Sequence, residues 1–137
     1  MVTGLASDSH TWNLVYLQLL IEELGYDVVN LGPCVPDDLL VAECQRLEPA
    51  MIVMSSVNGH GQCDGLRVIR LLRRCARLAT TPIVIGGKLG LSADRPEVYT
   101  DRLMAAGFDA VFVDGSIAEF RKFLATADAM SSIEAER

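Results

Sequence analysis

Short apolar segments alternate with segments of helical periodicity five times along this chain of 137 residues. Strands that alternate with helices in this way form a parallel sheet with helices packed on its faces. The alternation therefore predicts an α/β fold with a five-stranded parallel sheet. The predicted strands are Val2–Ala6, Asp27–Leu31, Met51–Met54, Thr81–Ile85 and Ala110–Val113.

The segments between these strands carry apolar residues three and four positions apart, the pattern of an amphipathic helix. In the first helix the pattern runs from Leu14 to Leu24, and Gly25 directly after it favours termination. The second helix is predicted to begin at Pro36, because proline and acidic residues suit the first turn. Three further helices are predicted, over Leu66–Cys75, Glu97–Ala105 and Ser116–Ala127.

Length and composition suit one domain, since half of the residues are hydrophobic and no linker or repeat interrupts the pattern. We predict a single domain over residues 1–128 and a frayed, disordered tail over residues 129–137. The formal net charge of -6 argues against nucleic-acid binding, which needs clustered basic residues. Neither a membrane-spanning segment of about 20 apolar residues nor a secretory leader is visible, so we expect a cytoplasmic protein.

Right-handed crossovers and five short units favour a doubly wound, flavodoxin-like (Rossmann-like) sheet with the strand order 2-1-3-4-5. In that order the first and third strands meet at the switch point, beside which such sheets bind ligands. Three polar or glycine-rich loops follow strands there: Asp8–His10, Ser55–Gly61 and Gly86–Gly87. We therefore expect the functional site at the carboxyl ends of these strands.

Two common functions of this fold fit the loops poorly. A phosphoacceptor receiver domain needs a lysine after the fifth strand, where this chain has Asp114, Gly115 and Ser116. An FMN-binding flavodoxin needs a glycine-containing phosphate loop after the first strand, and residues 8–13 contain no glycine. The sequence also has neither a GxGxxG nor a P-loop lysine pattern.

Asp8 and His10 form the most informative pair in these loops. A histidine that binds a metal usually donates its other ring nitrogen to a carboxylate, which sets the tautomer and raises the basicity of the ring. Asp8 lies two residues before His10 and can reach it in this way. Taken alone, the pair also fits a helix-capping Asp8 followed by an incidental loop histidine.

The wider pattern is Asp8-x-His10, then Ser55-x-Val57, then Gly86-Gly87. It resembles the DxHxxG…SxL…GG signature of cobalamin-binding domains, and is most similar to the small subunits of the glutamate mutase (methylaspartate mutase) family over nearly the whole chain. The resemblance implies that His10 is the lower ligand of the cobalt in cobalamin and that Asp8 orients it. It implies the following cofactor-binding residues: Asp8, Ser9, His10, Thr11, Asn13, Ser55, Val57, Gly59, His60, Gly86, Gly87, Gly115 and Ser116.

The sequence departs from the signature at two positions. Asn13 stands where the motif has glycine, and Val57 where it has leucine. Asparagine tolerates positive φ, so the backbone path can be kept, although its side chain would narrow the site. Gly86 and Gly87 would let the nucleotide tail of the cofactor approach the backbone closely, because they lack a Cβ atom. Trp12, which has no counterpart in the motif, either packs near the corrin edge or covers the first helix.

The resemblance implies adenosylcobalamin as cofactor and a carbon-skeleton mutase as the activity, with L-glutamate and threo-3-methylaspartate, or a related acid, as its substrates. Since no complete catalytic set is visible in this chain, it would act in a hetero-oligomer with a larger barrel-shaped catalytic subunit. Two alternatives stay open at this stage. One is a corrinoid methyl carrier, and the other is a non-catalytic cobalamin sensor or partner-binding module.

Overall fold

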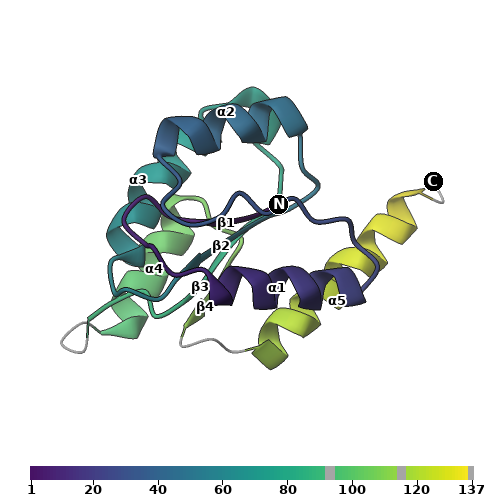
Figure 1. Ribbon diagram of the computed structural model, residues 1–137. Coiled ribbons are helices and arrows are strands. Elements are labelled where there is room, and N and C mark those ends of the chain that lie inside the picture. The colour runs from purple at the N-terminus through teal and green to yellow at the C-terminus, as the bar shows by residue number, and fades with distance from the viewer. Residues whose placement is uncertain (92–94, 114–116, 136–137) are drawn as a thin grey trace.

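The computed structural model describes residues 1–91, 95–113 and 117–135, which fold into a parallel β-sheet with helices on both faces (Figure 1). The strands are β1 (Val2–Gly4), β2 (Ile52–Ser56), β3 (Ile83–Gly87) and β4 (Ala110–Val113), in the spatial order β1-β2-β3-β4. The helices are α1 (Trp12–Glu23), α2 (Asp37–Leu47), α3 (Gly61–Arg73), the 3-10 turn η1 (Ala76–Leu78), α4 (Pro96–Ala106) and α5 (Ile117–Ala135).

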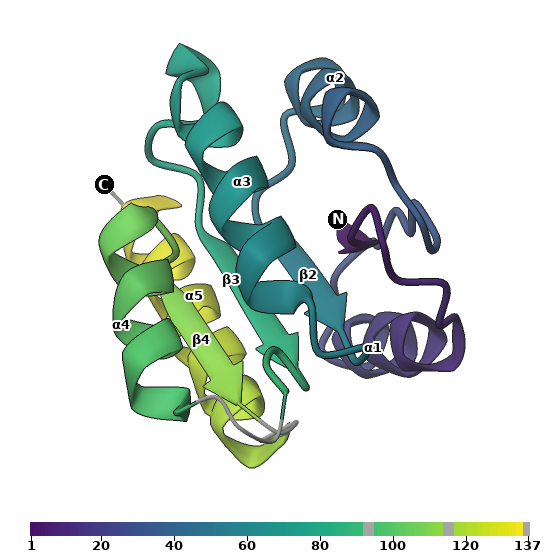
Figure 2. The same cartoon turned by 90° about the vertical axis from the view of Figure 1, so that its left-hand side faces the viewer.

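The sheet is the middle of three layers. Helices α2, α3 and α4 cover one face, and α1 and α5 cover the other (Figures 1 and 2). Each face has its own hydrophobic core: Leu40, Leu72 and Leu103 belong to the first, and Leu14 and Phe120 to the second. Strand β2 is buried along its whole length, as the apolar run in the sequence predicts for a strand covered on both faces.

The prediction of five strands in the order 2-1-3-4-5 is wrong in one element. The segment predicted as the second strand makes only an isolated parallel bridge between Val2 and Asn30. It lies along β1, because Leu31 N donates a hydrogen bond to Val2 O and Val2 N donates one to Val29 O, each 2.9 Å long. The other four predicted strands form with the predicted neighbours.

The physical reason for this difference is the short and exposed edge of the sheet. Strand β1 has only three residues, so it offers few ladder positions. None of residues 27–31 is buried, and Val29 is 46% exposed, so little burial favours an extended edge strand there. The chain then turns away at Gly32 and Cys34, both of which have positive φ.

Helix boundaries follow the predicted segments with local shifts. Helix α3 begins at Gly61, several residues before the predicted start at Leu66, and α4 lies within one residue of its predicted ends. Helix α5 continues to Ala135, past the domain boundary expected at residue 128. No helix within the described ranges is both long and apolar enough to cross a bilayer.

The register of the sheet brings the sequence motifs together. Ser55 of β2 pairs with Gly86 of β3, and Ser56 pairs with Gly87. On the other side of β2, Gly4 of β1 pairs with Ser55. The carboxyl ends of the three strands are therefore level, and the polar loops that follow them start side by side.

Candidate functional site

Asp8 and His10 contact each other directly at the carboxyl end of β1. The Asp8 side chain is almost fully buried, and its Oδ1 lies 2.6 Å from His10 Nδ1 and accepts a 3.0 Å hydrogen bond from the His10 backbone amide. This contact holds the ring in the tautomer that carries its proton on Nδ1. The structure therefore brings together the pair that the sequence singles out.

The other oxygen of Asp8 is bound to the neighbouring loop. Asp8 Oδ2 accepts a 2.7 Å hydrogen bond from the backbone amide of Val57. Burial raises the pKa of the Asp8 carboxyl, but the hydrogen bonds that it accepts from His10, Val57 and Ser56 together outweigh that effect and hold its pKa below the ordinary value. Asp8 is thus an ionised acceptor at neutral pH.

Asp8 does not cap the first helix. The N-cap of α1 is Thr11, whose carbonyl accepts from the amides of Leu14 and Val15, and whose side chain makes no capping bond. Both Asp8 oxygens are instead engaged by His10 and Val57. The helix-capping interpretation of Asp8 is therefore wrong.

The His10 ring reaches outward from this anchor. Its side chain is 57% exposed, and Nε2 has no hydrogen-bond partner among the described residues. A neutral imidazole with Nδ1–H held by a carboxylate presents the lone pair of Nε2, the arrangement found in many metal-ligating histidines. The Nε2 atom of His10 is therefore exposed and available to accept a hydrogen bond or to act as a ligand.

A narrow apolar pocket of about 140 Å³ opens beside this loop, between the sheet and the helices α1 and α5. Five of the residues that line it are among the site residues predicted from the sequence. It also holds aromatic and aliphatic side chains that the sequence interpretation missed, although three of its residues on α1 are spaced i, i+3, i+4. The lining residues are Asn13, Tyr16, Leu17, Val53, Met54, Ser55, Val57, Val84, Gly86, Gly87, Phe112, Ile117 and Phe120.

The glycine pair serves the sheet as well as the pocket. A Cβ atom on Gly87 would lie 2.2 Å from the carbonyl oxygen of Ser56, and Gly87 has a φ of +110°. A Cβ atom on Gly86 would lie 3.2 Å from the carbonyl oxygen of Phe112. The protein's own backbone therefore requires glycine at position 87, because any Cβ atom there would collide with Ser56 O. The sequence alone suggests a different reason, the close approach of a ligand.

Asn13 and Ser55 join α1 to β2 at the pocket. Asn13 Nδ2 donates to Ser55 Oγ over 2.6 Å, while Asn13 Oδ1 is buried and has no hydrogen-bond partner among the described residues. An unpaired buried acceptor costs about 1–3 kcal/mol. Asn13, one of the two residues that depart from the family signature, thus leaves one buried acceptor at the pocket without a hydrogen bond among the described residues.

The remaining predicted residues lie around this centre. Ser9, Thr11 and His60 are exposed, and Gly59 is buried with its amide donating to Lys88 O. His60 precedes α3 as its N-cap. Trp12 does not cover the first helix, since 86% of its surface is exposed. Two predicted residues lie outside the described residues: Gly115 and Ser116.

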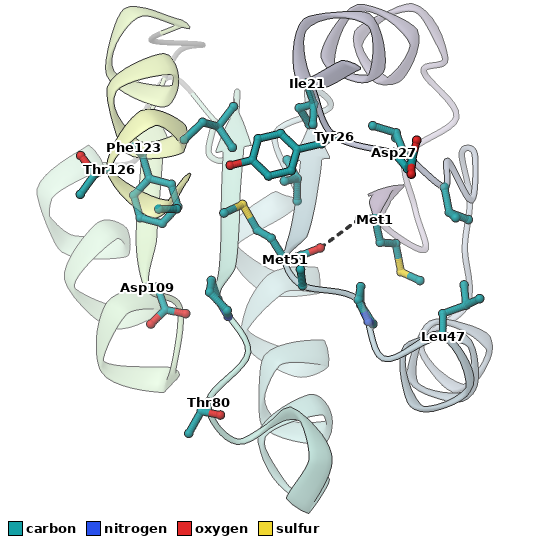
Figure 3. A pocket seen from close by; sticks show the side chains of 18 residues that line it. Met1, Ile21, Tyr26, Asp27, Leu47, Met51, Thr80, Asp109, Phe123 and Thr126 are labelled. Atoms are coloured by element: carbon teal, nitrogen blue, oxygen red, sulfur yellow. Dashed lines mark hydrogen bonds between the residues drawn. The ribbon is translucent and has the colours of Figure 1, made fainter. Parts of the chain in front are cut away.

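A larger cavity of about 820 Å³ lies elsewhere, at the amino ends of the strands (Figure 3). Met1, Tyr26, Met51, Asp109 and Phe123 are among its lining residues, and the Met1 amino group donates to Met51 O over 2.9 Å. Although it is the larger of the two, it contains none of the predicted site residues. Parallel α/β sheets bind ligands at the opposite, carboxyl edge, where His10 lies.

Comparison with known proteins agrees with this geometry. The family model described as the B12 binding domain matches residues 1–121. A glutamate mutase sigma subunit from Fusobacterium nucleatum is similar to the chain, with 29% identity over 116 residues, which cover 82% of each protein.

Two solved structures have the same fold. A cobalamin-binding protein from Desulfitobacterium hafniense is similar to 80% of this chain, with a TM-score of 0.66 and 19% identity. The methanol:cobalamin methyltransferase complex from Methanosarcina barkeri is similar to 94% of it, with a TM-score of 0.69 and 20% identity. The chain spans 50% and 44% of the lengths of those two chains. With its family model matched over most of its length and an aspartate-held histidine beside an apolar pocket, the chain belongs to the family of B12-binding domains.

Proposed function

We propose that this chain is the cobalamin-binding subunit of an adenosylcobalamin-dependent carbon-skeleton mutase. The observation that carries the proposal is the buried Asp8 carboxylate bound to His10 Nδ1 while Nε2 of the same ring has no partner among the described residues. His10 Nε2 is the atom that would bind cobalt, in place of the cofactor's own base. Asp8 would keep the imidazole in the correct tautomer and increase its electron donation to the metal.

The apolar pocket between α1 and α5 would hold the displaced nucleotide tail. Its aromatic and aliphatic walls suit a flat heteroaromatic base, and Ser55 would donate a hydrogen bond to that base. The missing side chain at Gly86 would leave room for the base above β3. Asn13, which lines the same pocket, would narrow the space for the tail where the family signature has glycine.

When bound, the cofactor would supply the radical chemistry that the rearrangement of the substrate needs. This chain would bind and orient the cofactor, and His10 would supply a ligand to its cobalt, because the reactive chemistry belongs to the cofactor. We propose that the substrate is bound by a separate, barrel-shaped catalytic subunit in the same cytoplasmic hetero-oligomer. L-glutamate and threo-3-methylaspartate are the proposed substrate and product, supported by the similarity to the glutamate mutase sigma subunit.

The test is an absorption titration of the purified chain with cobalamin, run beside His10→Ala and His60→Ala. The expected result is a base-off, histidine-ligated spectrum in the wild type and in His60→Ala, and no histidine ligation in His10→Ala. Histidine ligation that survives His10→Ala would overturn the assignment of the axial ligand.

Activity then separates the mutase from a methyl carrier. The chain would be combined with a glutamate mutase catalytic subunit and adenosylcobalamin, and the conversion of L-glutamate would be followed. Turnover that requires both chains supports the mutase. Methyl transfer from methylcobalamin to a thiol acceptor, without any turnover of L-glutamate, would favour the carrier instead.

A further inference from the structure

A buried carboxylate outside the predicted site holds the residue that precedes Asp8. Asp64, in the first turn of α3, is only 7% exposed. Its Oδ2 accepts hydrogen bonds from both the backbone amide and the hydroxyl of Ser7. The pair is separated by 57 positions in the sequence, so the contact ties the loop after β1 to a different helix.

Asp64 is itself fixed by charge. Its Oδ1 accepts from Arg67 Nη1 over 3.1 Å, and Arg67 forms a second, two-bond ion pair with Asp37 at the start of α2. A charged acceptor makes stronger hydrogen bonds than a neutral one. Ser7 is therefore attached to a carboxylate that the neighbouring arginine holds in place.

Asn58 provides a second hold on the same residue. Its Nδ2 donates to Ser7 O over 3.0 Å and lies 3.2 Å from Ser7 Oγ. Asn58 Oδ1 in turn accepts from the amide of His60 and from Ser56 Oγ. The backbone on both sides of the Ser7 side chain is thus restrained by the loop after β2 and by α3.

These contacts act on the loop that carries His10. Ser7 is directly joined to Asp8, and His10 is the second residue beyond Asp8. A loop with exposed residues such as Ser9 would sample several backbone conformations unless it is tied down. Holding one end of it reduces the conformational freedom lost when a ligand binds, which is the source of affinity gained by preorganisation.

We propose that Asp64 is a positioning residue: through Ser7 it holds the Asp8–His10 loop in the conformation that presents His10 Nε2 to cobalt. This inference rests on the proposed cobalamin-binding function and assigns a role to a residue outside the family signature. Among the described residues, the Asp64 side chain has no hydrogen bond or ion pair to His10 and does not line the apolar pocket, so we expect it to act on His10 through Ser7. Removal of the Asp64 side chain should therefore weaken ligation by His10 and leave the lining of the tail pocket unchanged.

The experiment compares Asp64→Ala, Asp64→Asn and Ser7→Ala with the wild type. Two quantities are measured by absorption: the cobalamin dissociation constant, and the fraction of bound cobalamin that is histidine-ligated at saturation. For Asp64→Ala we expect cobalamin to bind about tenfold more weakly and a smaller fraction of it to be histidine-ligated, from the loss of hydrogen bonds to a charged acceptor. Asp64→Asn keeps an acceptor for Ser7, so it should lose less cobalamin affinity and less histidine ligation than Asp64→Ala.

Asp37→Asn is the matched control. Asp37 pairs with the same arginine, Arg67, as Asp64 does, but it has no hydrogen bond to Ser7. The substitution therefore removes one negative charge beside Arg67 and leaves the Ser7 contact in place. We expect its histidine-ligated fraction to equal that of the wild type. Equal losses in Asp37→Asn and Asp64→Ala would show that the ion pairs only brace α2 against α3, and would overturn the proposal.

The double variant Ser7→Ala/Asp64→Ala completes the test. Since the two residues act on one contact, the combined loss of affinity should be smaller than the product of the single losses. Full additivity, or a wild-type histidine-ligated fraction in Asp64→Ala, would overturn the proposal. If Asp64→Ala does not fold, the histidine-ligated fractions of Ser7→Ala and Asp37→Asn are compared instead. A lower fraction in Ser7→Ala supports the proposal, and equal fractions overturn it.

The outcome is separable from the test of the proposed function. Absence of histidine ligation in the wild type would count against the function itself. Histidine ligation in the wild type that is insensitive to Asp64 and Ser7 would count against the positioning role alone. Thermal unfolding of each variant identifies any general loss of stability.

Discussion

The backbone amide of Val57 donates a 2.7 Å hydrogen bond to Oδ2 of Asp8, two residues that are 49 positions apart. This bond links the motif after β1 with the motif after β2. Because Asp8 Oδ1 is bound to His10, one oxygen of the carboxylate contacts the ring and the other contacts the loop after β2. The orientation of His10 is therefore set by the loop after β2 as well as by its own loop.

Replacing the Asp8 carboxylate should weaken the histidine as a ligand. In Asp8→Asn the side chain keeps its size, but it loses the negative charge and one of the acceptors now bound to His10 and Val57. We expect cobalamin affinity to fall by about 10–100-fold, the usual cost of losing the carboxylate behind a metal-ligating histidine. Titration by absorption measures the change, and an unchanged affinity would contradict the role given to Asp8.

The low pKa of Asp8 predicts how stability depends on pH. A carboxyl whose pKa is lower in the folded state contributes stability at pH values above its ordinary pKa of 3.8, and that stability is lost as the pH falls through the folded value. We expect urea midpoints of the wild type to fall at pH values below about 4 more steeply than those of Asp8→Asn. Parallel curves for the two proteins would show that Asp8 does not contribute.

Gly87 should be intolerant of any side chain. In Gly87→Ala the new Cβ would meet Ser56 O at 2.2 Å and the residue would keep a positive φ, so we expect a loss of about 3–4 kcal/mol in the free energy of unfolding. Gly25→Ala is the matched control, because Gly25 also has positive φ but a Cβ atom there would meet no heavy atom within 4 Å. Its expected loss is about 1–2 kcal/mol, measured by denaturant unfolding.

Asn13→Gly restores the family signature at the pocket. It removes the buried acceptor Oδ1 together with the bond from Nδ2 to Ser55, so the two effects on stability oppose each other and we expect a change within about 1 kcal/mol. Cobalamin affinity should rise severalfold, because the pocket widens where the side chain now stands. Asn13→Leu fills the same space and should lower the affinity. A weaker complex in Asn13→Gly would mean that the Asn13 amide itself contacts the ligand.

Much of the fold could be predicted because the signals are local. Apolar runs such as Met51–Met54 and the helical spacing from Leu14 to Leu24 depend on neighbouring residues only. The error at residues 27–31 arose because β-branched composition does not report burial. Whether a segment becomes an edge strand depends on what covers it, and here Val29 stays 46% exposed.

The α/β alternation, the spacing of Asp8 and His10, and the glycines at 86 and 87 are all present in the linear sequence, where local patterns are enough to find them. The way these parts meet depends on the folded molecule. Its packing sets the register that places Ser55 beside Gly86, the bond from Val57 to Asp8, and the hold of Asp64 on Ser7. These contacts join residues tens of positions apart, and their geometry depends on how the helices and strands pack, which no local periodicity encodes.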